Sequence, residues 1–199
     1  VVKFGVIGYG SIGQRHVRNL FSLGHEDIVL LRNIGSSNEY DLTEYNDVQA
    51  FLDTQLDAVI IANPTSLHAE YLSQILALNM HVLVEKPLVA TLEEWQLLQH
   101  QLVNYKGIGM TAYNMRYHPC VIEIKNSLAK DKFGKTYYAR FFVGQYLPDW
   151  RPGTDYSKSY SASREMGGGV LFDLIHEIDL ACFLVGAPTN NVDGWIDKV

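Results

Sequence analysis

The chain has 199 residues, 47% hydrophobic and 19% charged, an ordinary globular composition that argues against disorder. Its formal net charge of −6 offers no basic field for a phosphate backbone, so nucleic acid is not an expected partner. Two cysteines without C-x-x-C spacing favour a reduced, cytoplasmic setting without disulfides. We find no signal-peptide pattern and no apolar run near the ~18 residues of a membrane span, so we expect no membrane association.

Short apolar runs alternate with amphipathic segments through the first half of the chain, which is typical of βαβ units around a parallel sheet. The expected strands cover residues 3–7, 27–31, 57–62, 81–84 and 107–111. The expected helices cover residues 11–23, 44–53, 66–78 and 92–104, and Thr91 with Glu94 forms a capping box at the start of the last.

After Tyr113 the alternation ends, and we expect a boundary between a dinucleotide-binding domain, 1–118, and a partial substrate or oligomerisation domain, 119–199. Pro119 suits the first turn of a helix. A strand over 136–146, a polar aromatic loop, a helix over 170–185 and a possible strand over 192–198 follow. The predicted fold is therefore α/β, a doubly wound parallel Rossmann sheet followed by a partial α+β domain with an incomplete open sheet.

The stretch GYGSIG, residues 8–13, follows the first expected strand at the spacing G-x-G-x-x-G. Gly8 allows the tight turn, Gly10 lets a pyrophosphate approach the backbone, and Gly13 allows close packing of helix on strand. The following helix would present the amides of its first turn, which includes Ser11 and Ile12, to the phosphates. The alternative is a glycine-rich turn without a ligand.

Arg32 and Asn33 stand at the end of the second expected strand, where NAD enzymes carry an acidic residue for the ribose 2′-hydroxyl. An arginine can instead pair with a 2′-phosphate, and Ser36 nearby could add a hydroxyl donor. This pattern favours NADP, with NAD possible. The alternative is a surface arginine without cofactor contact.

The segment EKP puts Glu85 and Lys86 directly after an expected strand, at the sheet edge where ligands bind. The lysine could stabilise the oxygen of an alcohol as it becomes a carbonyl. A surface lysine paired with Glu85 is an equal alternative.

In the last expected helix, Asp173, His176 and Asp179 fall three apart and are expected on one helical face. His176 could pass a proton near neutral pH, with a carboxylate beside it to orient the ring. The alternatives are a solvated face or a structural N-cap. No second histidine is placed to complete a metal site, so no metal is expected.

Five segments in order, GYGSIG, ANPTSLHAE, EKP, YNMRYHP and GGGVLFDLIHEID, resemble the Gfo/Idh/MocA family of glucose-fructose oxidoreductases and inositol dehydrogenases. The resemblance implies that Lys86 contacts the substrate and its reacting oxygen, and that the Lys86-Pro87 bond is cis. It also implies that His176 is the acid or base and that Asp173 is its partner in binding substrate. It puts the following residues at the cofactor: Asn63, Pro64, Thr65, His68, Glu85 and Lys86. It puts Asn114 and Arg116 at the substrate cleft. Family members are commonly much longer, so we expect a fragment or a natural truncation.

Tyr146, Trp150, Arg151 and Tyr156 offer hydrogen bonds and flat apolar faces, which suit a sugar ring. We therefore expect hydride transfer between a nicotinamide cofactor, NADP favoured, and a secondary alcohol or carbonyl of a sugar, cyclitol or sugar derivative. The incomplete sheet would make the protein a homo-oligomer, because two strands cannot cover an apolar face independently. The alternatives are a catalytically impaired cofactor-binding sensor or remnant, and a scaffold in which the nucleotide is structural.

Overall fold

The computed structural model describes residues 1–33, 38–150, 153, 155–163, 165–188 and 190–195. The chain divides into two units. The first contains residues 1–112 and 155–172, and the second contains residues 113–154 and 173–199. The chain therefore leaves the first unit, builds part of the second, and returns.

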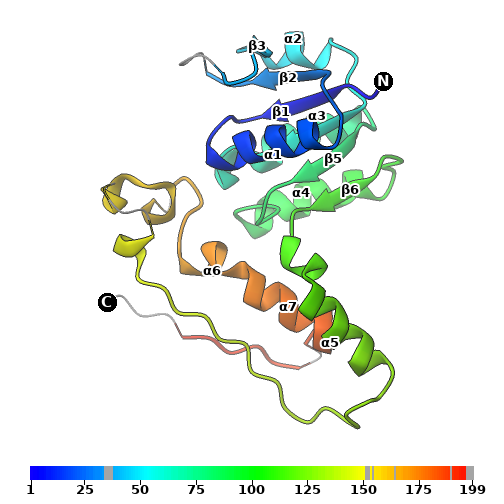
Figure 1. The fold of residues 1–199 in the computed structure, drawn as a ribbon, viewed down its shortest axis with the longest axis vertical. Coiled ribbons are helices and arrows are strands. Elements are labelled where there is room, and N and C mark those ends of the chain that lie inside the picture. Colours follow the sequence, from blue (N-terminus) through cyan, green and yellow to red (C-terminus); the bar gives the residue numbers. More distant parts are fainter. Residues whose placement is uncertain (34–37, 151–152, 154, 164, 189, 196–199) are drawn as a thin grey trace. The chain divides into compact units, whose positions relative to one another are not determined.

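A six-stranded sheet forms the centre of the first unit (Figure 1). In chain order its strands are β1 (Phe4–Ile7), β2 (Ile28–Leu31), β3 (Thr43–Tyr45), β4 (Ala58–Ile61), β5 (His81–Val84) and β6 (Gly109–Thr111). Every neighbouring pair is parallel, and the spatial order is β3-β2-β1-β4-β5-β6. This is the doubly wound order of a Rossmann fold, and it confirms the predicted parallel sheet.

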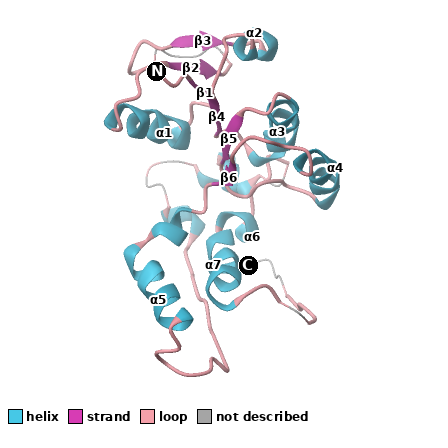
Figure 2. Cartoon of the chain, turned by 90° about the vertical axis from the view of Figure 1, so that its right-hand side faces the viewer, coloured by secondary structure: helices cyan, strands magenta, loops and turns pink. Residues whose placement is uncertain are grey.

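Helices cover both faces of this sheet. Figure 2 shows α1 (Ser11–Ser22) on one face, and α3 (His68–Ala77) and α4 (Leu92–Leu102) on the other. Two apolar clusters correspond to these faces. Val17 and Leu20 of α1 pack with Val6 and Leu30 of the strands, whereas the α3 and α4 face carries the larger cluster. All four β2 residues are buried, as expected of a strand covered on both sides.

The start of α4 follows the predicted local chemistry. The Thr91 side chain accepts a hydrogen bond from the Glu94 amide at 3.2 Å, and the Glu94 carboxylate accepts from the Thr91 amide at 3.1 Å. The capping box is therefore confirmed.

The helix predicted over 44–53 is wrong in its first part. Residues 43–45 instead form β3, whose Thr43 and Tyr45 pair with Val29 and Leu31 of β2. The helix α2 (Val48–Leu52) begins later because Asp47 caps it, accepting from the Ala50 amide at 2.7 Å. Glu44 consequently lies on a strand at the edge of the sheet.

Residues 155–172 belong to the first unit and contain two 3₁₀ turns, Tyr156–Lys158 and Tyr160–Ala162. This segment packs on the 3₁₀ turn η1 (Thr65–Leu67), because the Ser66 amide donates to the Met166 carbonyl at 3.3 Å. A Cβ placed on Gly167 would lie 2.8 Å from the Cβ of Thr65, so this close approach requires glycine.

The second unit contains the 3₁₀ turns η2 (Asn114–Tyr117) and η3 (Leu147–Asp149) and the helices α5 (Pro119–Ala129) and α7 (Ile175–Val185). Pro119 is in the first turn of α5, as predicted. Figure 1 shows α5 beside α7, and the Lys125 ammonium donates to the Phe183 carbonyl between them. No helix among the described residues is long and apolar enough to cross a membrane.

Two expectations for the second half are wrong. Residues 136–146 contain no strand. Residues 192–195 contain no strand either, and residues 196–198 of that expected strand lie outside the described residues. A strand forms only when its backbone groups pair with a neighbour, and no strand occurs in the described residues of this unit. The helix expected over 170–185 is divided at Leu174, whose φ of −103° and ψ of 24° separate α6 (Val170–Asp173) from α7.

Candidate active site

The carboxyl ends of the central strands bring three sequence segments together. Ile7 lies opposite both Leu31 and Ile61. One residue further, the Gly8 amide donates to Leu31 at 2.9 Å and the Glu85 amide donates to Ile61 at 2.9 Å. The strand order reverses between β1 and β4, the switch point at which doubly wound sheets bind ligands.

The three glycines of the first turn have different surroundings. Gly8 has φ of +90°, and a Cβ on it would lie 2.7 Å from the Asn63 amide nitrogen. A Cβ on Gly13 would lie 2.1 Å from the Gly8 carbonyl oxygen, whereas one on Gly10 would meet no described atom within 4 Å. The turn is therefore closed against β4 and open at Gly10, where a ligand can approach the backbone.

Helix α1 starts directly at this opening. Its first intrahelical bond runs from the Gln14 amide to the Gly10 carbonyl at 2.9 Å. The amides of Ser11, Ile12 and Gly13 precede that bond and have no partner within the helix. They form the positive end of the helix dipole, which suits a pyrophosphate.

Asn63 and His68 form the next part of the edge. The Asn63 Oδ1 atom is buried and has no hydrogen-bond partner among the described residues, as expected of a group that receives a ligand. His68 is 1% exposed, and its ring nitrogens lie 3.0 Å from the Asn63 carbonyl and 2.9 Å from the Pro87 carbonyl. Burial lowers the pKa of His68, so the ring is neutral at neutral pH and donates to one of these carbonyls.

The EKP segment follows β5, and its Lys86-Pro87 peptide bond is cis, as the family resemblance implied. The Lys86 ammonium donates to the Phe172 carbonyl at 3.3 Å. His16 Nε2 lies 2.7 Å from Glu85 Oε1, and Glu85 Oε2 accepts from the Lys86 amide at 3.2 Å. Burial alone would raise the pKa of Glu85, but the bond from His16 and the nearby positive charges outweigh it and lower that pKa.

Arg32 lies at the end of β2 and is held by β3. Its Nε and Nη2 atoms donate to the two Glu44 carboxylate oxygens at 2.8 and 2.6 Å, and its guanidinium lies 5.1 Å from the centre of the Tyr9 ring. The bond from Arg32 lowers the pKa of Glu44. Asn33 is exposed, and Ser36 lies outside the described residues.

Arg116 and His176 belong to the second unit. The Arg116 guanidinium donates hydrogen bonds from Nε and Nη2 to the Asp179 carboxylate, with the Nε atom 2.9 Å from Oδ2. These bonds raise the pKa of Arg116. The His176 ring lies edge-on to Tyr113, with ring centres 6.3 Å apart. The division at Leu174 puts Asp173 in α6, whereas His176 and Asp179 both lie in α7, so the single helical face expected for all three is wrong for Asp173.

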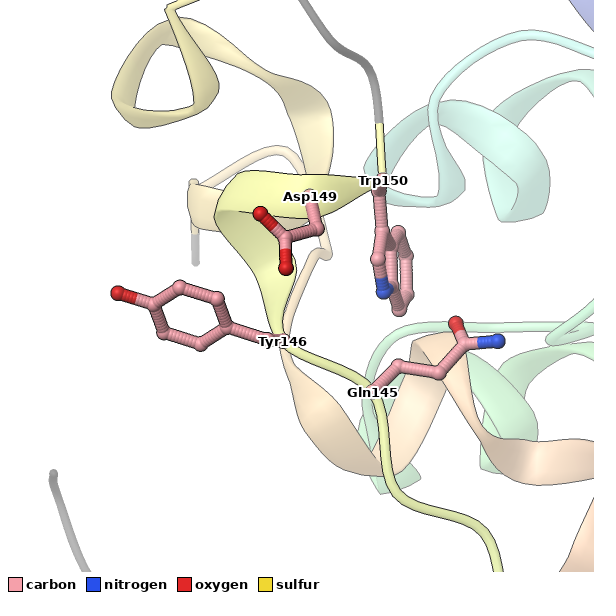
Figure 3. A pocket seen from close by; sticks show the side chains of 4 residues that line it. All are labelled: Gln145, Tyr146, Asp149 and Trp150. Atoms are coloured by element: carbon pink, nitrogen blue, oxygen red, sulfur yellow. The ribbon is translucent and has the colours of Figure 1, made fainter.

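A pocket of about 440 Å³ lies in the second unit, lined by Gln145, Tyr146, Asp149 and Trp150 (Figure 3). Trp150 and Gln145 face each other across it, and Tyr146 points outward. The indole nitrogen of Trp150 is buried without a partner in the described part of the chain.

Two further residues were expected at the sugar site. Tyr156 belongs to the first unit and is 46% exposed. Arg151 lies outside the described residues.

The remaining expected residues lie in or directly beside the 3₁₀ turns η1 and η2. Pro64 precedes η1, Thr65 is buried within it, and Asn114 begins η2. Among the described residues, no group of three or more His, Cys, Asp and Glu side chains could hold a metal ion.

The sequence analysis missed three residues near the glycine turn and the end of β2: Tyr9, His16 and Glu44. His16 follows Gly13 by three residues in α1, so helical spacing puts both on the same face of that helix and could have identified His16. Glu44 was missed because residues 44–53 were predicted to be a helix.

Comparison with known proteins agrees with this geometry. Residues 2–113 match the family model described as "Oxidoreductase family, NAD-binding Rossmann fold", and residues 121–199 match the GFO/IDH/MocA C-terminal domain. The scyllo-inositol 2-dehydrogenase (NAD(+)) of Bacillus subtilis is 26% identical over 97% of this chain and 56% of its own length. The levoglucosan dehydrogenase of Pseudarthrobacter phenanthrenivorans is 32% identical over 67% of this chain and 34% of its own length.

The solved structure of a levoglucosan dehydrogenase in complex with NADH and L-sorbose has a TM-score of 0.75 and 25% identity, covering 94% of this chain and 53% of that one. The chain spans about half the length of the curated relatives it matches.

The sheet order, the glycine turn and the family match define an oxidoreductase-type protein with an NAD-binding Rossmann fold. More narrowly, the chain belongs to the Gfo/Idh/MocA family.

Proposed function

We propose that the protein transfers a hydride between a nicotinamide dinucleotide and a secondary alcohol or carbonyl of a sugar, cyclitol or sugar derivative. The observation that carries the proposal is the meeting of three segments at the carboxyl edge of the sheet: the glycine turn, Asn63 and the EKP segment. These are the groups that a phosphate, a nicotinamide and a reacting oxygen require at one edge.

The residues present fit a dinucleotide. The opening at Gly10 and the first amides of α1 suit a pyrophosphate, and the buried Oδ1 of Asn63 suits an amide donor of the ligand. When bound, the nicotinamide supplies the hydride acceptor or donor.

The chain's own residues would supply the proton and charge chemistry. Lys86 carries an ammonium that can stabilise negative charge developing on the substrate oxygen. We assign to His176 the role of base for the hydroxyl proton, with Asp173 orienting substrate or histidine. Glu85 has a carboxylate bonded to the Lys86 amide, which fixes the backbone beneath that lysine.

The substrate class rests on the relatives and on the pocket chemistry. The relatives named above are dehydrogenases of scyllo-inositol and of levoglucosan. The pocket of Tyr146, Asp149 and Trp150 combines aromatic faces with polar groups, which suits the C–H face and the hydroxyl edge of a ring. Asn114 and Arg116 are further substrate candidates, although Arg116 already binds Asp179.

The expected preference for NADP depends on Arg32 and on its partner Glu44. Arg32 stands where a 2′-phosphate would be read, which supports NADP, but Glu44 already occupies the Nε and Nη2 edge of its guanidinium. The named relatives are described with NAD(+) or NADH.

Association into a homo-oligomer is likewise proposed. The segment 133–146 carries exposed aromatic side chains, including Tyr137 at 86%, Tyr138 at 81% and Phe142 at 78%. An apolar run of this kind gains stability when another surface covers it.

The test combines binding with turnover on the purified protein. NADH and NADPH fluorescence enhancement measures cofactor binding, and absorbance at the nicotinamide band measures turnover with myo-inositol, scyllo-inositol, levoglucosan and L-sorbose. We expect His176→Ala to lose at least about a hundredfold in turnover while NADH affinity changes little. Full turnover by this variant would contradict the assigned role, and the absence of any NADH binding by the unaltered protein would contradict the proposal.

A further inference from the structure

Arg32 is fixed between two groups that come from neighbouring elements. Tyr9, in the glycine turn after β1, presents its ring to the guanidinium at 5.1 Å. Glu44, in β3, binds the guanidinium from its Nε and Nη2 atoms. The Arg32 side chain is consequently 13% exposed, so its direction is set by the surrounding structure.

Glu44 is itself fixed. Asn38 donates to its Oε1 atom at 2.6 Å, and the Arg32 amide donates to the carbonyl of the neighbouring Tyr45 at 2.9 Å. The Glu44 side chain is 21% exposed, and hydrogen bonds hold the pKa of its carboxyl below the usual range, so it is ionised at neutral pH. The ion pair of Arg32 and Glu44 therefore carries almost no net charge at the end of β2.

The Nε and Nη2 edge of an arginine is a pair of parallel donors that matches two oxygens of a carboxylate or of a phosphate. Glu44 takes this edge. A 2′-phosphate at the end of β2 would have to share the guanidinium with a carboxylate of like charge, whereas a 2′-hydroxyl carries no charge to be repelled.

We propose that Glu44 is a specificity-determining residue that discriminates against NADP by acting as the counter-ion of Arg32. The proposal rests on the proposed function, since it concerns the dinucleotide of that same site. Glu44 neutralises the positive charge with which Arg32 would attract a 2′-phosphate, and its effect on NADH is small because the 2′-hydroxyl of NADH carries no charge.

The experiment titrates NADH and NADPH separately into the protein and into Glu44→Gln, following nicotinamide fluorescence. Glutamine keeps the size and one acceptor of the carboxylate but removes its charge. We expect the ratio of the NADPH to the NADH dissociation constant to fall about tenfold, the order given by one unit charge several ångströms away in partly exposed surroundings. The change should shrink in high salt, which screens the phosphate.

Glu26→Gln is the matched control, because it removes the same charge from an exposed residue just before β2. Glu26 therefore lies at the amino end of that strand, whereas Arg32 lies at its carboxyl end. It should leave the ratio within twofold. Thermal unfolding of each variant identifies any change that comes from lost structure, and Glu44→Asp, which keeps the charge, should shift the ratio less than Glu44→Gln.

The double variant with Arg32→Ala separates the two possible routes. If Glu44 acts through Arg32, Glu44→Gln should change the ratio by less than twofold once Arg32 is alanine. The inference would be overturned if Glu44→Gln left the ratio of the two dissociation constants unchanged, or if it shifted that ratio equally with arginine and with alanine at position 32. In either case, NADH binding by the unaltered protein would still support the proposed function. Loss of NADH binding in the unaltered protein would instead overturn the proposed function.

Discussion

Gly10 and Gly13 are three residues apart in the glycine-rich stretch, and their substitution by alanine should have different effects. At Gly10 the change should affect ligand binding, and at Gly13 it should affect stability. Gly10 has φ of −73° and ψ of −169°, an extended conformation that any residue adopts, and its Cβ would meet no described atom within 4 Å. The free energy of unfolding of Gly10→Ala should therefore be within about 0.5 kcal/mol of that of the unaltered protein. Its methyl group would stand where the pyrophosphate approaches, so NADH affinity should fall roughly thirtyfold, equivalent to about 2 kcal/mol.

Gly13→Ala should fail for another reason. Its Cβ would lie 2.1 Å from the Gly8 carbonyl oxygen, so that separation must widen by about 1 Å to reach ordinary contact. Overpacking of this kind costs about 3 kcal/mol, and the helix propensity of alanine returns about 1 kcal/mol. The net loss of about 2 kcal/mol should lower the midpoint of thermal unfolding by about 4–8 °C.

Thermal unfolding and NADH titration of the two variants side by side test this reasoning. The expected pattern is a stable Gly10→Ala that binds weakly and an unstable Gly13→Ala. Equal melting temperatures, or NADH affinity retained in Gly10→Ala, would refute the separation of the two roles.

Three other perturbations test the packing and charges. Phe51→Ala removes a side chain that is 0% exposed and should lower the free energy of unfolding by about 3–5 kcal/mol in chemical denaturation. Asp179→Asn weakens the ion pair with Arg116; since the arginine side chain is 40% exposed, solvent replaces part of the interaction, and we expect a loss of about 1–2 kcal/mol. His68 has a folded pKa below its unfolded value, so its stabilising contribution is full above about pH 6.5 and declines as the pH falls below that value, by at most about 1.4 kcal/mol per pH unit. This part of the stability profile should be absent in His68→Gln; an unchanged profile would contradict the buried neutral ring.

Local pattern predicted the first unit well where apolar runs end in recognisable chemistry. The β1 strand, the glycine turn and α1 occur as expected, and the capping box fixes the start of α4. Each depends on neighbours in the sequence, which is the kind of interaction that periodicity and capping rules describe.

The errors depend on partners distant in sequence. A three-residue strand such as β3 is too short to show alternation, and it forms because Thr43 and Tyr45 can pair with β2. The same error concealed Glu44 and made Arg32 look like an arginine available to a phosphate. The segment 136–146 shows the opposite error, a predicted strand that does not form. Its composition suits a sheet, but no neighbouring strand is described there for it to pair with.

The return of residues 155–172 to the first unit makes that unit discontinuous in sequence. The Phe172 carbonyl that accepts from Lys86, and the Met166 carbonyl that accepts from the Ser66 amide, both come from this returning segment. A protein ended after β6 would keep every strand of the sheet and yet lose the carbonyl that accepts from the Lys86 ammonium. Excising or transplanting the dinucleotide half therefore requires the later segment to be carried with it, joined by a new loop in place of residues 113–154.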